Sequence, residues 1–187
     1  EGILTVLAQI AAHEMGVKPE HVVIGDNDTA RAPEAAHAGA SRQTYMIGNV
    51  VALASREARQ RLVDVMAEMW DVEPATIRTG NGEIWAENTN HRISMGEAVA
   101  NAKNRGVVPI GSATFGTNTT GLDAVDGAGR PWQAYVFGCQ VAEVEVDTIT
   151  GEVQVLGVWA AHDVGRAVNP QGIEGQIEGG IVQAIGQ

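Results

Sequence analysis

The fold class is indicated most clearly by residues 142–161, AEVEVDTITGEVQVLGVWAA. Up to Asp147, apolar residues alternate with acidic ones, which is the pattern of a strand with one face in water. Residues 148–151 predict a turn, and the apolar residues that follow, up to Ala161, predict the return strand of a hairpin. A hairpin among helical segments favours an α+β fold over a doubly wound parallel sheet. We therefore expect a mixed sheet with hairpins, packed against several helices.

The stretch after this hairpin, HDVGRAVNPQGIEGQIEGGIVQ (residues 162–183), predicts a strand end, a polar loop and then a helix. Asn169 can accept hydrogen bonds from the first backbone N–H groups of that helix, and Pro170 suits its first position. Four glycines follow inside the helix, at positions 172, 175, 179 and 180. Each costs up to about 1 kcal/mol relative to alanine, a cost that is tolerated where another helix or a bulky ligand approaches the backbone.

Periodicity, capping residues and turn residues predict the remaining elements. A first helix is expected at 4–15 and ends at Gly16. A second, long helix is expected from Ser41, which caps it, to residue 69. A third is expected to begin at a capping box formed by Ser94 and Glu97 and to end at Arg105. A short buried strand is expected at 22–24. Two further strands are expected at 76–79 and 83–86, joined by a turn at 80–82. A strand at 107–115 is expected to lie at a sheet edge because it contains Pro109. Loops are expected at 29–40 and 116–131. We assign residues 1–187 to one partial domain, a fragment of a larger protein.

Composition argues against several classes of function. The net charge of −11 argues against a nucleic-acid partner, because binding to phosphates needs clustered Lys and Arg. No apolar run approaches the roughly 20 residues of a membrane span, and no signal peptide is visible. The single cysteine, Cys139, excludes an internal disulfide and a four-thiolate iron–sulfur site, and we expect it to be a small buried residue. These features fit a cytoplasmic protein with neither a nucleic-acid nor a membrane partner.

Spacing gives no support for a metal site built from histidines. The chain has 5 of them, and no pair has the short spacing of the usual zinc signatures. His162 is expected to form a hydrogen bond with a loop carbonyl, and Asp28 to form a turn. The chain has no phosphate-binding loop and no Gly-x-Gly-x-x-Gly that opens a helix, so a nucleotide-binding interpretation is weak.

Two short segments remain as candidate ligand sites. Residues 39–44 place small residues and hydroxyls at a helix start, where backbone N–H groups can bind an anion. Ordinary capping by Ser41 is the alternative. Residues 175–180 present the amide of Gln176 beside bare backbone, and close helix packing with a solvated glutamine is the alternative. Together with residues 1–2, these give three segments that could converge on one ligand.

Five motifs, in order along the chain, resemble one known family. They are Gly2-x-x-Thr5-Val6-Leu7-Ala8-Gln9-Ile10-Ala11, Gly39-Ala40-Ser41-Arg42-x-Thr44, Glu143-Val144-Glu145-Val146-Asp147-x-x-Thr150-Gly151, Asp163-Val164-Gly165-x-x-Val168-Asn169-Pro170 and Gly175-Gln176-Ile177-Glu178-Gly179-Gly180. The chain resembles the molybdopterin-binding subunit of the xanthine dehydrogenase and aldehyde oxidase family. The resemblance does not distinguish xanthine dehydrogenase from aldehyde, carbon monoxide, nicotinate, isoquinoline or aromatic acyl-CoA relatives.

The resemblance implies a molybdenum hydroxylase whose metal is held by the dithiolene of molybdopterin rather than by protein side chains. It implies cofactor contacts from Glu1, Gly2, Ala40, Ser41, Arg42, Gln43 and Gln176. Glu1 stands where the family usually has Gln, and an ionised Glu can only accept hydrogen bonds. The glutamate base of the family would lie beyond Gln187, so we assign no residue of this chain a catalytic or metal-ligating role.

The resemblance further implies that the parent protein is an oxidoreductase that hydroxylates an N-heterocycle or an aldehyde with oxygen from water. Electrons would pass to Fe-S and flavin (FAD) groups on other domains or subunits, and we expect an oligomer. The isolated fragment is expected to be inactive. The alternative is a non-catalytic structural or oligomerisation module derived from the same fold. Apolar residues on the last helix predict self-association of the chain alone: Ile173, Ile177, Ile181 and Ile185.

Overall fold

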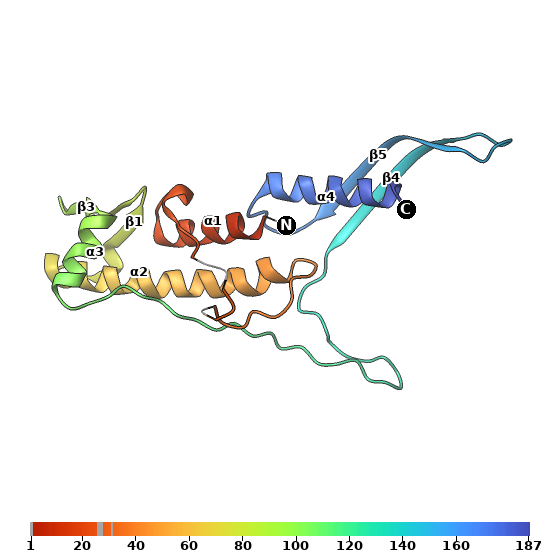
Figure 1. The fold of residues 1–187 in the computed structure, drawn as a ribbon. Helices are drawn as coiled ribbons and strands as arrows, with labels where there is room; N and C mark the ends of the chain where they lie inside the picture. Colours follow the sequence, from red (N-terminus) through yellow and green to blue (C-terminus); the bar gives the residue numbers. More distant parts are fainter. Residues whose placement is uncertain (1, 26–27, 31) are drawn as a thin grey trace. The chain divides into compact units, whose positions relative to one another are not determined.

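The computed structural model describes residues 2–25, 28–30 and 32–187. The chain divides into two compact units, Gly2–Gly116 and Thr117–Gln187, and each is described here by itself. Helices and antiparallel strands occur in both units (Figure 1), which confirms the α+β prediction. The strands of the described residues form two separate antiparallel sheets, β1-β2-β3 and β4-β5, rather than a single mixed sheet.

The first unit is built around one long helix. Its elements are α1 (Ile3–Met15), the short turn η1 (Pro19–His21), the π-helical turn η2 (Gln43–Ile47), α2 (Gly48–Trp70), η3 (Pro74–Thr76), β1 (Ile77–Gly80), β2 (Glu83–Ala86), β3 (Arg92–Ser94) and α3 (Met95–Asn104). Helix α1 packs along the first part of α2, and α3 packs against its later part (Figure 1). The core joins α2 to the sheet and α3, and its fully buried large side chains are Leu62, Met66 and Ile84.

Local sequence signals give several of these elements as predicted. Gly16 ends α1 with a φ of 73°, in the left-handed region that glycine adopts readily. Asn81 and Gly82 join β1 to β2 with φ values of 52° and 80°, as a tight hairpin turn requires. Ser94 and Glu97 form the predicted capping box at the start of α3. The third strand, β3, was not predicted, and it pairs with β2 over only three residues.

Two predicted strands are wrong. Residues 22–24 follow η1 and form no strand, and the side chain of Val23 is 90% exposed rather than buried. Residues 107–115 are extended but belong to neither sheet. They run against α2 instead, where the backbone N–H of Ser112 donates to the carboxylate of Glu57 at 2.8 Å. A Cβ on Gly111 would lie only 1.8 Å from the carbonyl oxygen of Ala54 in α2. A helix surface therefore takes the place of a sheet edge.

The second unit consists of a long hairpin, β4 (Phe137–Val146) and β5 (Val153–Asp163), and helix α4 (Pro170–Ile185). Both strands are longer than predicted, and a bulge near Glu143 and Val144 shifts their register. The expected loop that precedes β4 is closed by backbone hydrogen bonds, from Thr120 to Arg130 and from Asp123 to Ala128. Asn169 caps α4 as predicted, accepting from the N–H of Gly172 at 2.9 Å.

Side chains of this second unit are largely exposed. None of residues 117–187, all of which the structure describes, is buried. Cys139 is exposed, like every other residue of β4, so the prediction of a buried cysteine is wrong. On α4, Ile185 is 54% exposed, whereas Ile173, Ile177 and Ile181 are half-buried. None of the helices in the described ranges is both long and apolar enough to cross a membrane.

Candidate functional site

The start of α1 leaves backbone N–H groups without a side-chain cap. Gly2 precedes the helix in the left-handed conformation, with a φ of 67°, and no side chain caps the helix. The first N–H groups of any α-helix have no partner within the helix, and they carry its positive dipole end. No acidic side chain lies in the first turn of α1. The N–H groups of this helix start can therefore bind an anion or donate hydrogen bonds to an acceptor atom of a ligand.

The segment from Gly39 to Gln43 forms a second helix start. Ala40 has a φ of 47°, an uncommon value for a residue with a side chain, and the N–H of Arg42 donates to the carbonyl of Gly39 at 3.1 Å. The expectation that Ser41 caps the helix is wrong, because Arg42 takes the position before η2 and no side chain caps that turn. The side chains of Ser41 and Thr44 are exposed.

Two of the predicted cofactor residues hold this loop in shape. One guanidinium nitrogen of Arg42 donates to the carbonyl of Ala35 at 2.7 Å and to that of His37 at 3.2 Å. The amide of Gln43 donates to the same His37 carbonyl at 3.4 Å. These side chains therefore fix the approach of the loop to η2. The groups of this segment that remain exposed to a ligand are the backbone at Ala40 and the hydroxyl of Ser41.

Helices α1 and α2 run in the same direction, so their starts lie at the same end of this unit (Figure 1). Ile10 packs on Gly48 near the start of α2, and Glu14 lies farther along, opposite Arg56. The start of α1 lies roughly two helical turns before Ile10, and η2, which leads directly into α2, begins roughly one turn before Gly48. The two positive helix ends therefore lie at one end of the unit, where each can attract an anionic ligand.

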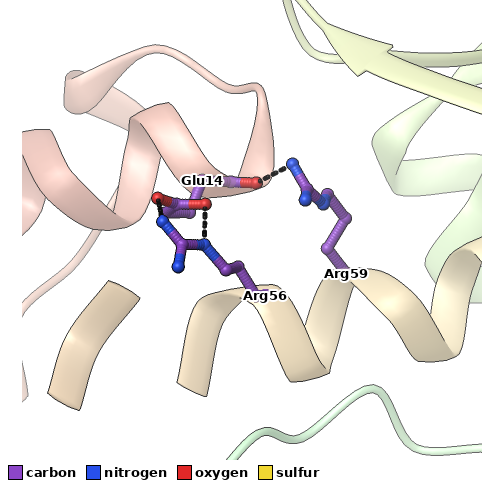
Figure 2. Close-up of polar contacts among 3 residues, drawn as sticks. All are labelled: Glu14, Arg56 and Arg59. Carbon is purple, nitrogen blue, oxygen red and sulfur yellow. Dashed lines mark hydrogen bonds and ion pairs between the residues drawn. The ribbon is translucent and has the colours of Figure 1, made fainter. Parts of the chain in front are cut away.

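A polar cluster that the sequence analysis missed connects the same two helices (Figure 2). The carboxylate of Glu14, a residue only 9% exposed, accepts from Nε of Arg56 at 2.8 Å and from Nη2 at 2.6 Å. Arg59 donates to the backbone carbonyl of Glu14 at 2.8 Å. The hydrogen bond from Arg56 lowers the pKa of Glu14 below its usual value, against the opposing effect of burial. The available signal was a charged residue between the apolar positions Ala12 and Met15 of α1.

The remaining predicted residues do not yet form one site. Gln176 is exposed on α4, which belongs to the second unit, and Glu1 lies outside the described residues. A Cβ on Gly175, Gly179 or Gly180 would meet no atom within 4 Å, so no other part of the second unit packs on this backbone. The convergence of the three segments on one ligand stays a prediction.

Two other sequence expectations concern single residues. His162 forms its side-chain contact with Gln140, at 3.1 Å between Nε2 atoms, so the expected bond to a loop carbonyl is wrong. The reason is that β5 extends to Asp163, which places His162 inside the ladder opposite Gly138. The carboxylate of Asp28 accepts from the N–H of Ala30 at 2.9 Å, which confirms its predicted role in a turn.

An open depression of about 460 Å³ lies at the end of α2. Its walls carry four carboxylates, from Asp64, Glu68, Asp71 and Glu73. A phosphate would be repelled there, so this depression is a poorer anion site than the paired helix starts. No cluster of three or more His, Cys, Asp or Glu suited to a metal ion occurs within the ranges that the structure describes.

Residues 1–187 match the family model of the molybdopterin cofactor-binding domain along their whole length. The chain belongs to this family. The match confirms the family to which the sequence motifs pointed, and molybdopterin as its cofactor. The paired helix starts are features of the domain that suit the phosphate of such a cofactor.

Similar proteins support this assignment. The chain is 30% identical to the 6-hydroxypseudooxynicotine dehydrogenase complex subunit gamma of Paenarthrobacter nicotinovorans, over all of the chain and 23% of the relative. It is 30% identical to the carbon monoxide dehydrogenase large chain of Hydrogenophaga pseudoflava, over all of the chain and 23% of the relative. The crystal structure of quinoline 2-oxidoreductase from Pseudomonas putida 86 superposes with a TM-score of 0.81, at 27% identity, over 97% of this chain and 22% of that one. The domain thus spans about a quarter of the length of these relatives.

Proposed function

We propose that this molybdopterin cofactor-binding domain is part of the large subunit of a molybdenum hydroxylase. The parent would hydroxylate a carbon of an N-heterocycle or an aldehyde with oxygen taken from water. The observation that carries the proposal is the match of residues 1–187 to the cofactor-binding family, together with relatives that are dehydrogenases and oxidoreductases. The domain itself would supply binding rather than proton transfer.

The residues present fit a phosphorylated pterin. The start of α1 at Gly2 and the turn at Ala40–Ser41 offer N–H and O–H donors at one end of the first unit. Arg42 and Gln43 would act indirectly, by holding the loop that presents those donors. Gln176 can both donate and accept, and its exposed amide could contact the pterin or the metal centre. When bound, the cofactor supplies the two-electron redox chemistry.

Glu1 in place of the usual glutamine is a distinctive position of this sequence. An ionised carboxylate can only accept, so it would repel an electron-rich ligand that an amide would bind. A Glu1→Gln variant of the full-length protein should therefore bind the cofactor at least as tightly as the wild type. Weaker binding would indicate that a protonated Glu1 acts as a donor.

The proposal includes redox partners. We propose that Fe-S and FAD groups on other domains or subunits receive the electrons, since one of the relatives is named as a subunit of a dehydrogenase complex. A small-molecule substrate, assembly into an oligomer and a cytoplasmic location complete the proposal. Which heterocycle or aldehyde reacts would be decided by residues that line the substrate pocket.

Analysis of molybdenum and of pterin in the full-length protein tests the proposal. The protein should be produced in a host that makes the cofactor, and one molybdenum and one pterin per subunit are expected. If a folded protein from such a host contains neither molybdenum nor pterin, the proposal is contradicted and the non-catalytic module is favoured. Hydroxylation assays with heterocycles and aldehydes, in water labelled with oxygen-18, would then test the reaction.

A further inference from the structure

We propose that Glu14, Arg56 and Arg59 form a positioning clamp that holds the two helix starts of the cofactor site in register. The inference rests on the proposed function, because the starts matter only if they bind the pterin. In the part of the chain that the structure describes, the hydrogen bonds of these three residues lead to one another and not to a predicted cofactor residue. They act through the placement of α1 on α2 (Figure 2).

The geometry of the clamp restricts sliding and rotation of one helix on the other. Two nitrogens of Arg56 donate to the carboxylate of Glu14, at 2.8 and 2.6 Å. Such a bidentate pair fixes the relative orientation of the two side chains as well as the distance between them. Arg59 holds the carbonyl of Glu14, which belongs to the backbone of α1. Arg56 and Arg59 lie three residues apart and so project from one side of α2. The helix is therefore held at both a side chain and its backbone.

Within the described residues, the side-chain hydrogen bonds between α1 and α2 are those of the clamp. Near the start of α2, Ile10 meets Gly48, an apolar contact without directional preference. At the other end of α1, Gly16 packs on the backbone of Thr79 and Gly80 in β1, and its carbonyl accepts from the N–H of Gly82 at 2.8 Å. The clamp lies between these two contacts and supplies directional hydrogen bonds from α1 to α2. A small shift of a binding group can lower the strength of an interaction by a large factor, so register matters at a cofactor site.

The carboxylate of Glu14 differs from the exposed ion pairs of the unit. Its side chain is 11% exposed, whereas both partners of the pair Arg61–Glu57 are more than 40% exposed. Exposed pairs on one helix contribute little to stability. Glu57 also accepts from the backbone N–H of Ser112 at 2.8 Å, but that bond involves neither Arg61 nor α1. The Arg61–Glu57 pair lies on α2, like Arg56, and its nitrogen-to-oxygen distance is 2.8 Å. It is therefore a matched control.

The test uses the full-length protein and four single variants: Arg56→Met, Arg56→Lys, Arg61→Met and Ile84→Val. Ile84 is fully buried in β2 and takes no part in the hydrogen bonds of the clamp, so Ile84→Val lowers stability without removing any of them. For each variant, the thermal midpoint of the cofactor-free form is measured. The rate at which molybdenum and pterin leave the loaded form during gel filtration and dialysis is measured separately, so the result does not depend on activity.

We expect Arg56→Met to release cofactor about tenfold faster than the wild type, because the helix starts lose their fixed register. Arg56→Lys should recover part of the loss, since it keeps the charge but not the fork. Arg61→Met and Ile84→Val should match the wild type in release, even where Ile84→Val lowers the thermal midpoint as much as Arg56→Met does. If Arg56→Met does not fold, Arg56→Lys provides the same comparison.

Equal release from Arg56→Met and Arg61→Met would overturn the clamp. Equally fast release from Ile84→Val would also overturn it, because general stability would then explain the loss. In both cases a wild type that holds cofactor leaves the proposed function standing. A wild type that holds no cofactor contradicts the proposed function itself, and the clamp with it.

Discussion

The Cδ1 atom of Ile10 in α1 lies 3.0 Å from the place that a Cβ on Gly48 would take at the start of α2. This separation is tighter than ordinary contacts, so the two helices approach each other where one of them has no side chain. The glycine is buried, and the side chain of Ile10 fills the space above it. The close approach sets the spacing of the two helix starts.

A larger residue at position 48 should therefore separate α1 from α2. Gly48→Val should lower the free energy of unfolding by about 1–3 kcal/mol, the usual effect of overpacking. Chemical denaturation followed by tryptophan fluorescence measures the change. Gly96→Ala is the matched control, because Gly96 also lies in a helix and its Cβ would meet only a hydroxyl, at 4.0 Å. That control should be neutral or stabilising by up to about 1 kcal/mol. Equal stability of the two variants would show that Ile10 simply moves aside.

Gly16 is expected to tolerate no side chain for two separate reasons. Its φ is 73°, and a Cβ would lie 2.7 Å from the backbone nitrogen of Gly80. Gly82 has a similar φ of 80° but nothing within 4 Å. Gly82→Ala should therefore cost about 1–2 kcal/mol from backbone strain alone. Gly16→Ala should cost more by about 1–3 kcal/mol, because backbone atoms must also shift. Comparison of the two unfolding curves isolates the steric part.

The stability that Glu14 provides should depend on pH. Its pKa is lowered chiefly by the hydrogen bond from Arg56, so the folded chain binds fewer protons there than the unfolded chain. The contribution is therefore complete above the unfolded pKa, about 4.5, and is lost as the pH falls through the lower folded value. Glu14→Gln should cost about 1–3 kcal/mol near neutral pH, and the difference should shrink in acid. Urea unfolding of both proteins from about pH 7 to about pH 3 measures this. A difference that does not change with pH would contradict an ionic role.

The Asn169 cap should contribute to the stability of α4, the helix that carries Gln176. Asn169→Ala removes the acceptor for the N–H of Gly172 and should weaken the helix by about 1 kcal/mol. Hydrogen exchange at that amide should become faster, while exchange in α2 stays unchanged. Asn169→Asp keeps an acceptor and should preserve most of the protection. Similar exchange in Asn169→Ala and the wild type would mean that other contacts hold the start of α4.

Features set by neighbouring residues were predictable from the sequence. The Asn81-Gly82 turn, the capping box of Ser94 and Glu97 and the cap at Asn169 each depend on residues at most three positions apart. The strands predicted at 22–24 and 107–115 fail because a strand needs a partner far away in the chain, which the local pattern cannot reveal. Residues 107–115 pack against the surface of α2 instead of pairing with a strand.

In the candidate site, too, local features were predictable and contacts between distant residues were not. The small residues of the segment from Gly39 to Gln43 were visible in the sequence, but the use of Arg42 to hold its own loop was not. The pairing of Glu14 with Arg56 joins residues 42 positions apart, and only the packing of α1 on α2 brings them together. Nothing in the order of residues shows that the two helices run in the same direction.

The long hairpin of β4 and β5 has consequences for how the isolated chain of 187 residues unfolds. Isolated two-stranded hairpins are marginally stable, and no side chain of residues 117–187 is buried. The first unit, in contrast, has fully buried residues such as Leu62 and Met66. We therefore expect proteases to cut the hairpin while the first unit is still folded. Unfolding would then proceed in two separate steps, with the helices that flank the cofactor segments as the more durable part.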